Sequence, residues 1–275
     1  MLEVIAHLIH AVRGALRGIH APTGARRDTC AARRVRALQL IVSSAVCIVS
    51  MPSNASLSIV GTRFVFPGDA KTLAIGVRNV GDAPVLVQTW LDDGKPDANP
   101  ATIRVPFMLA PPIFRLDPMQ KRAIRVQYIE GGLATDRESL FWINVLELPA
   151  SASASDGDRT LRVVYRVRMK LLFRPVGLAG APDGAPDALH WAIDRPAADA
   201  ARLVATNPSP YYVALTRVEL GGAPPKPVSR ATDVPPFGRV EWPVHDDLAE
   251  FGTVVYEAVR DDGSLIERRA PLEQR

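Results

Sequence analysis

Residues 160–175 constrain the fold more than any other stretch of this chain. From Leu161 to Arg168, apolar side chains alternate with mainly basic ones, which predicts an extended strand with two different faces. One face carries Leu161, Val163, Tyr165 and Val167. A strand of this kind either packs its apolar face into the chain's own core or offers that face and its edge to another chain. Alternation alone leaves both interpretations open.

Residues 1–55 are expected to be a leader that includes a signal peptide at about 33–55. A basic cluster (Arg33, Arg34 and Arg36) precedes an apolar run over residues 37–50, and small residues follow at Ser53-Asn54-Ala55. This order of basic, apolar and small segments is typical of a secretory signal peptide. The alternative is a membrane anchor, but the apolar run is shorter than the roughly 20 residues that a membrane span requires.

Removal of this leader changes what composition implies about the rest of the chain. Both cysteines, Cys30 and Cys47, lie in the leader, so residues 56–275 would contain no disulfide. The leader also holds 7 of the 33 basic residues and 2 of the 29 acidic ones, which leaves 26 basic and 27 acidic residues. Because the remaining chain is near neutral, no nucleic-acid partner is expected.

Enzymatic chemistry has little support in the sequence. His190 and His245 are the only histidines after the leader, and their spacing is not that of a metal site. The chain has no nucleophile elbow, phosphate-binding loop or dinucleotide glycine motif. We therefore expect no catalytic residue, no metal and no cofactor.

Short apolar or alternating runs separated by Gly, Pro, Asn and Asp predict an all-β fold of two immunoglobulin-like sandwiches. Gly, Ala and Pro dominate residues 174–186, where we place the boundary between the domains. The expected domains are residues 56–176 and residues 177–275.

Six segments, in this order and at these spacings, carry a resemblance to a known family. They are residues 61–67, 111–118, 136–149, 168–175, 207–212 and 235–238. The chain resembles the periplasmic pilus-assembly chaperones of Gram-negative bacteria, the PapD-like proteins. The short connection between residues 148 and 161 suggests their subclass with a short F1–G1 loop.

The resemblance implies a boomerang of two domains with a cleft between them, and a periplasmic chaperone for pilus or fimbrial subunits. Such a protein lends its G1 strand to a subunit that lacks a strand, and then delivers the subunit to an outer-membrane usher. The lent side chains would be Leu161, Val163, Tyr165 and Val167. An exposed apolar strand edge would also favour a self-capping homodimer.

The same resemblance implies roles for five charged residues. Arg63 and Lys170 would anchor the C-terminal carboxylate of the subunit, a task that suits a guanidinium and an ammonium group. Arg115, Glu138 and Asp261 would form an inter-domain charge network, in which Asp262 is an alternative to Asp261. The competing hypothesis is a secreted two-domain adhesin or structural module that keeps its last strand to itself.

Overall fold

The computed structural model describes residues 56–129, 131–149, 164–195, 201–222, 225–245 and 251–274. The described residues contain β-strands, one 3-10 helix and no α-helix, so none of their helices is long and apolar enough to span a membrane. The predicted signal peptide, together with Leu161 and Val163, lies outside them. Residues 54–275 form one compact unit.

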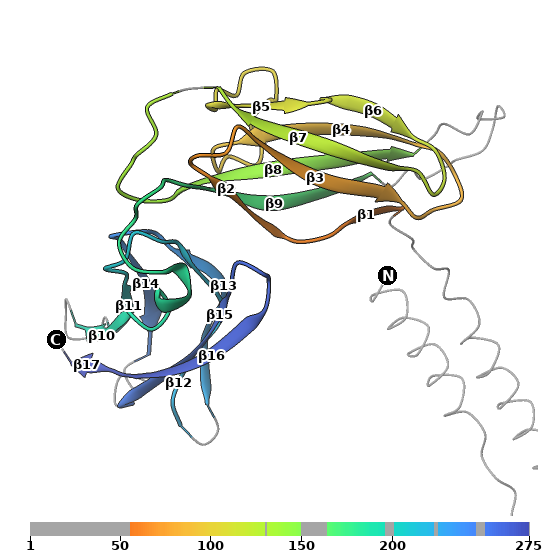
Figure 1. Ribbon diagram of the computed structural model, residues 1–275. Coiled ribbons are helices and arrows are strands. Elements are labelled where there is room, and N and C mark those ends of the chain that lie inside the picture. The colour runs from red at the N-terminus through yellow and green to blue at the C-terminus, as the bar shows by residue number, and fades with distance from the viewer. Residues whose placement is uncertain are drawn as a thin grey trace, which may run out of the picture. The chain divides into compact units, whose positions relative to one another are not determined.

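The first nine strands build the N-terminal sandwich (Figure 1). They are β1 (Leu57–Ile59), β2 (Arg63–Pro67), β3 (Thr72–Asn79), β4 (Val85–Asp92), β5 (Phe107–Ala110), β6 (Ile113–Leu116), β7 (Lys121–Tyr128), β8 (Ser139–Pro149) and β9 (Tyr165–Arg174). One sheet has the order β1-β3-β7-β5 and the other has the order β2-β9-β8-β4-β6. The chain therefore changes sheets between β1 and β2.

The core of the N-terminal sandwich follows from the period of two that strands impose on their side chains. Along β3, Ile75 and Val77 are buried and alternate with exposed Ala74 and Gly76. The opposing sheet contributes the buried residues of β8 and β9 to the same cluster. Phe66, Phe107 and Phe173 are among its aromatic members, and their ring centroids lie 5.4 to 6.1 Å apart.

A second sandwich follows the 3-10 helix η1 (Pro182–Gly184). Its strands are β10 (His190–Asp194), β11 (Ala201–Thr206), β12 (Val213–Leu220), β13 (Lys226–Val234), β14 (Arg239–Val244), β15 (Thr253–Val259), β16 (Leu265–Pro271) and β17 (Glu273–Gln274). Their sheet orders are β14-β11-β10-β17 and β13-β12-β15-β16. The predicted boundary at residues 176/177 falls between β9 and η1.

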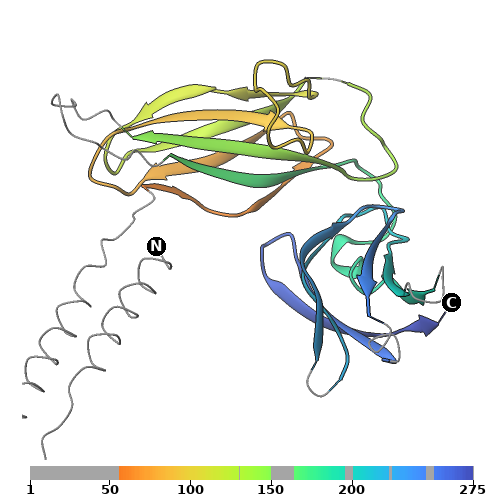
Figure 2. The same ribbon diagram turned by 180° about the vertical axis from the view of Figure 1, so that it is seen from behind.

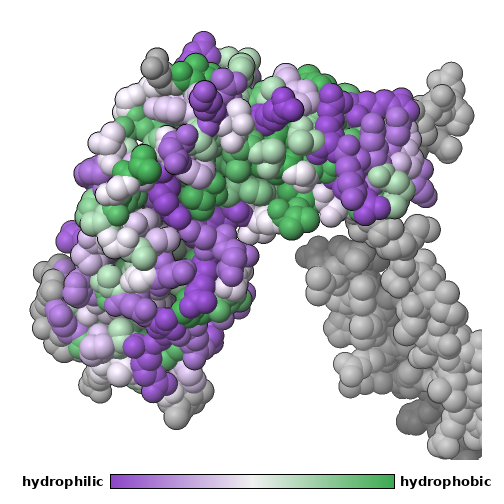
Figure 3. All heavy atoms as spheres, in the orientation of Figure 1, coloured by the Kyte–Doolittle hydropathy of each residue, from purple (hydrophilic) through white to green (hydrophobic). Residues whose placement is uncertain are grey.

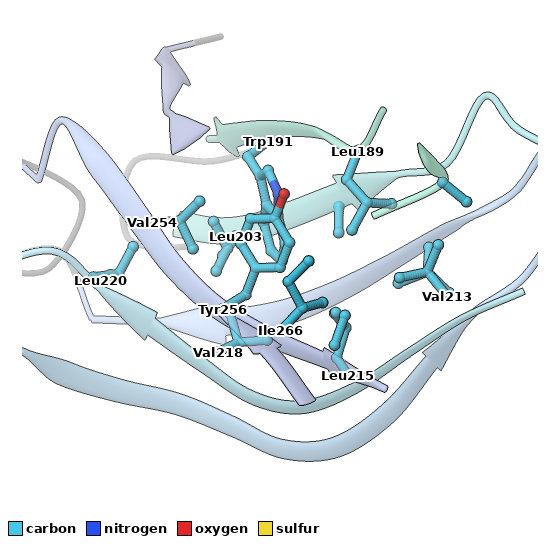
Figure 4. Close-up of a cluster of buried hydrophobic side chains, with 14 of the residues drawn as sticks. Leu189, Trp191, Leu203, Val213, Leu215, Val218, Leu220, Val254, Tyr256 and Ile266 are labelled. Atoms are coloured by element: carbon cyan, nitrogen blue, oxygen red, sulfur yellow. The ribbon is translucent and has the colours of Figure 1, made fainter. Parts of the chain in front are cut away.

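The two sheets of this C-terminal sandwich meet in an apolar core (Figure 4). Trp191 of β10 and Tyr256 of β15 point toward each other, with their ring centroids 5.0 Å apart. The Tyr256 hydroxyl donates a hydrogen bond of 2.8 Å to the Pro186 carbonyl, so its polar end is satisfied inside the core. The predicted class, all-β with two immunoglobulin-like sandwiches, is confirmed.

Candidate functional site: an open strand edge beside an inter-domain charge cluster

β9 has a complete neighbour on one side and a partial neighbour on the other. The antiparallel strand β8 pairs with it from Tyr165 to Phe173. The parallel strand β2 pairs with it only from Lys170 to Arg174, and the last backbone bond on that side runs from the Lys170 N–H to the Thr62 carbonyl at 3.1 Å. Among the described strands, none pairs with residues 166–169 on the β2 side. We call residues 166–169 the open edge. Figure 2 shows the N-terminal sandwich from behind.

The two faces of β9 differ as the sequence predicts. Its register with β8 runs from Tyr165 to Phe173 without a bulge, so alternate residues keep to one face. Met169 and Leu171 on that face are buried in the core of the sandwich. Val167 has the same parity, yet 41% of it is exposed. The apolar row of β9 therefore continues from the core onto the surface.

The other face of β9 carries cations that pack on aromatic rings of the neighbouring strands. The Arg168 guanidinium lies 4.1 Å from the ring centroid of Trp142, and that of Arg166 lies 5.0 Å from Trp90. Arg168 also forms an ion pair with Asp92, a fully buried residue of β4. Burial alone would raise the pKa of Asp92, but hydrogen bonds from Arg168 and Asn144 lower it overall. These contacts tie the open half of β9 to β8 and β4.

Arg63 and Lys170 are register partners on β2 and β9, so their side chains project to the same side of the sheet. Only 6% of the Arg63 side chain is exposed. Its guanidinium donates hydrogen bonds to the carbonyls of Tyr212 at 3.3 Å and Val259 at 3.5 Å, both in the C-terminal sandwich. Burial lowers the pKa of Arg63, while Asp261, Glu138 and Asp233 oppose that change.

Lys170 also contacts the C-terminal sandwich. Its ammonium lies 2.5 Å from a carboxylate oxygen of Asp233 on β13, and 5.6 Å from the ring centroid of Trp142. The two predicted anchor residues thus lie together at the junction of the sandwiches. Each already has a partner within the chain.

The charge cluster at this junction has a different cation from the one that the sequence predicted. Arg174 donates to Glu138 at 2.6 Å and forms a bidentate pair with Asp261 at 2.6 and 3.0 Å. Arg115 instead pairs with Asp117 near its own strand, where both side chains are exposed. The structure therefore brings Glu138 and Asp261 together but leaves out Arg115. We call Glu138, Arg174 and Asp261 the junction triad.

The exclusion of Arg115 has a simple geometric cause. Arg115 is an exposed residue of β6, an edge strand on the far side of the sheet from β2 and β9. Arg174 is the last residue of β9 and lies beside β2, where the chain leaves the N-terminal sandwich. Its position just before Pro175, at the predicted strand end, was the signal that could have identified it.

Glu138 is the most buried member of the junction triad. Its second carboxylate oxygen accepts a hydrogen bond of 2.7 Å from the Tyr212 N–H. Burial raises the pKa of Glu138, although that bond and Arg174 act in the opposite direction. Asp262 takes no part in the triad, because its carboxylate accepts from the Ser264 N–H in an exposed turn.

A small cavity adjoins Arg63 and is lined by Tyr212, Val259 and Asp261, among others. Its volume of about 10 Å³ is enough for roughly one water molecule. The Arg63 Nε atom is buried without a hydrogen-bond partner, and it lies 3.9 Å from Asp261. Within the described part of the chain, no group of three or more His, Cys, Asp and Glu residues could hold a metal ion. The side chains that the structure brings together here are charged, and they lie beside a strand edge.

Comparison with known proteins gives matches to both halves of the chain. Residues 56–179 match the family model "Pili and flagellar-assembly chaperone, PapD N-terminal domain". Residues 184–270 match "Pili assembly chaperone PapD, C-terminal domain". The chain is 35% identical to "Probable fimbrial chaperone YadV" of Escherichia coli over 240 residues, which cover 84% of this chain and 97% of that protein.

Two further similarities extend the match to other organisms. The "Chaperone protein FimB/FhaD" of Bordetella pertussis is 38% identical over 196 residues, which cover 69% of this chain and 79% of that protein. The solved structure of the Pseudomonas aeruginosa CupB2 chaperone is 33% identical, with a TM-score of 0.65 over 78% of this chain and 100% of that one.

A second solved structure contains a partner. It is the Salmonella enterica SafA pilin in complex with the SafB chaperone, at 25% identity and a TM-score of 0.67 over 81% of this chain and 99% of the matched one.

Proposed function

Because this chain belongs to the PapD family of pili and flagellar-assembly chaperones, we propose that it is a periplasmic chaperone that binds pilus or fimbrial subunits. Its relatives are chaperones rather than enzymes, so its task is binding and not chemistry. The chain acts by donor-strand complementation: β9, the last strand of its N-terminal sandwich, fills the groove of a subunit that lacks a strand.

The open edge carries this proposal. Residues 166–169 lack a described strand on the β2 side, while β8 holds the other side of β9 in place. A subunit strand could add there through backbone hydrogen bonds, and alternate side chains of β9 would enter the subunit's groove. Val167 is apolar, exposed by 41% and aligned with buried residues of the same strand. Because 41% of Val167 is exposed, burial of that remainder in a partner would contribute about 1 kcal/mol.

Arg63 and Lys170 are proposed to anchor the subunit's C-terminal carboxylate, which fixes the register of the added strand. Their adjacency on β2 and β9 supports this role, because both side chains project to one side of the sheet. Lys170 is 24% exposed and pairs with Asp233, a partly exposed contact that an incoming carboxylate could replace. Arg63 is more deeply buried and would contribute mainly through its charge.

The remaining steps of the proposal concern other partners. The exported chain, freed of its signal peptide, would pass its subunit to an outer-membrane usher. In the absence of a subunit, the same apolar edge would be covered by a second copy of the chain in a self-capping homodimer. No nucleic acid and no cofactor takes part.

Co-expression with candidate pilus subunits from the same organism tests the proposal. We expect Val167→Arg and Lys170→Ala each to reduce recovery of the subunit in a pull-down from the periplasm by at least tenfold. Val167→Arg would bury a charge in the apolar groove of the subunit, which is costly, and Lys170→Ala removes the ammonium group that would bind the subunit's carboxylate. The matched control is Arg125→Ala, which removes an exposed cation from β7 in the other sheet.

Urea unfolding of each purified variant shows whether it is still folded. Subunit recovery that stays unchanged in the folded Val167→Arg and Lys170→Ala variants would exclude donor-strand complementation. It would favour the alternative, an adhesin or structural module that keeps β9 for its own sandwich.

A further inference from the structure

Glu147 of β8 points into the N-terminal sandwich, where charged side chains are rare. It has the same parity as Phe141, Ile143 and Val145, which are buried core residues of the same strand. Glu147 itself is only 6% exposed. A carboxylate in such a position requires partners for both of its oxygens.

The carboxylate reaches across to the opposite sheet and contacts the residues that precede and begin β1. One oxygen accepts from the Ser56 hydroxyl and lies 3.4 Å from the Ser56 backbone nitrogen. The other oxygen accepts from the Leu57 N–H at 3.2 Å. Glu147 therefore binds the beginning of the sandwich's first strand through three donors.

All three donors are neutral in the intact chain. Among the described residues, no Lys, Arg or His forms an ion pair with Glu147. A buried carboxylate that meets only neutral donors is stabilised less than one that also meets a cation, because charge-assisted hydrogen bonds are about twice as strong as neutral ones. A group that brought a positive charge beside Glu147 would therefore stabilise its carboxylate further.

The surrounding chain holds Ser56 in place. Its carbonyl accepts a hydrogen bond of 2.7 Å from the Val80 N–H. Gly81 packs so closely that a Cβ atom there would lie 2.7 Å from the Ser56 Cβ. Asn79, itself fully buried, accepts a hydrogen bond from the Gly81 N–H and so fixes this loop. The backbone nitrogen of Ser56 is therefore kept beside the carboxylate.

We propose that signal cleavage between Ala55 and Ser56 creates an α-ammonium group that forms an ion pair with Glu147 inside the sandwich. In this hydrolysis, water adds to the Ala55 carbonyl carbon and the C–N bond to Ser56 breaks. The released carboxyl group gives its proton to the Ser56 amine. An α-amino group has an ordinary pKa of about 7.7–8.0, so it is charged at neutral pH. Ser53-Asn54-Ala55 supplies the small residues that a signal peptidase reads.

The consequence is that processing completes the fold of the N-terminal sandwich. Before cleavage, the Ser56 backbone nitrogen offers Glu147 a neutral N–H beside the hydroxyl; after cleavage, the same nitrogen offers a cation. The gain depends on the new terminus being Ser56 itself, because one additional residue would move the ammonium by about 3.5 Å along the chain.

The test is to export the full-length chain and a variant with one glycine inserted between Ala55 and Ser56. Both keep Ala55 at the cleavage position, and mass spectrometry identifies each mature terminus. We expect Ser56 as the first residue of the unaltered protein. We also expect the glycine-extended protein to unfold at a Tm about 3 °C lower, the effect of one partly buried ion pair in a protein of this size.

The control repeats the comparison in Glu147→Gln, which keeps the size of the side chain but removes its charge. In this background the inserted glycine should leave the Tm unchanged. An equal decrease in Tm with Glu147 and with Glu147→Gln would contradict the proposed ion pair. A mature terminus at another residue would also contradict it.

A second measurement does not depend on the folding of Glu147→Gln. We expect the α-amine of Ser56 to react with an acylating ester at neutral pH about fivefold more slowly than the terminal glycine of the extended protein, because the ion pair keeps it protonated and shielded. Equal reaction rates would contradict the proposal.

Discussion

The two halves of β9 share one strand and one alternation but differ in what covers them. From Lys170 to Arg174 the strand lies between β2 and β8, and its apolar residues are fully buried. From residue 166 to 169, only β8 is beside it among the described strands, and Val167 is exposed. Alternation decides which face of a strand is apolar, whereas the neighbouring strands decide whether that face is buried or exposed.

The difference arises from where β2 begins. β1 pairs with β3 in one sheet, and the chain then crosses to the other sheet before β2 starts at Arg63. Gly61 lies in this crossing with φ +101°, a conformation that favours glycine. Because β2 joins β9 only at Lys170, the earlier residues of β9 are left without that neighbour. Figure 3 shows apolar side chains gathered over the middle of this sandwich.

Substitution in the covered half should have the largest effect on stability. Leu171 is 0% exposed within the core, so Leu171→Ala should lower the free energy of unfolding by about 3 kcal/mol. Urea unfolding measures this change. Val167→Ala, in the open half, is the matched substitution and should cost less than about 1 kcal/mol because Val167 is already half exposed. Similar losses for the two variants would remove the distinction between the halves.

The cations on the outer face of β9 should have the next largest effect. Arg168→Ala leaves the buried Asp92 carboxylate without its cation, so the free energy of unfolding should fall by about 2 kcal/mol. Arg166→Ala is the control: it removes a cation–π contact and two hydrogen bonds to the Asn144 Oδ1 atom, but no ion pair with a buried acid. An equally large loss of unfolding free energy in Arg166→Ala would show that packing on the tryptophans, and not the ion pair with Asp92, stabilises the open half of β9.

The same ion pair predicts a dependence of stability on pH. The pKa of Asp92 in the folded protein lies below its ordinary value of 3.8. The stabilisation is therefore complete above that value and is lost as the pH falls through the lower folded-state pKa. We expect the difference in free energy of unfolding between the unaltered protein and Asp92→Asn to be constant near neutral pH and to shrink below about pH 4. A difference that grows in acid would reverse the assigned direction.

Sequence reasoning predicted local patterns well and long-range neighbours less well. The alternation of Tyr165 and Val167 against Lys170, and the all-β class, depend on spacing along the strand and were predicted correctly. The open edge depends on the length of β2, a strand about 100 residues earlier in the chain, which no local pattern reports. Arg174 was missed for the same reason: its partners, Glu138 and Asp261, come from two different domains.

The sequence could not show that Lys170 of the proposed anchor already forms an ion pair with Asp233 in the folded chain. Both side chains are about a fifth to a quarter exposed, so solvent screens the pair only in part and it contributes about 1 kcal/mol to folding. A subunit carboxylate must displace Asp233 before it binds the ammonium. Asp233→Asn should therefore lower the free energy of unfolding by no more than about 1 kcal/mol and tighten subunit binding about threefold, a change that competition between tagged chaperones for one subunit can measure. Weaker binding in Asp233→Asn would mean that Asp233 orients Lys170 for the subunit and does not compete with it.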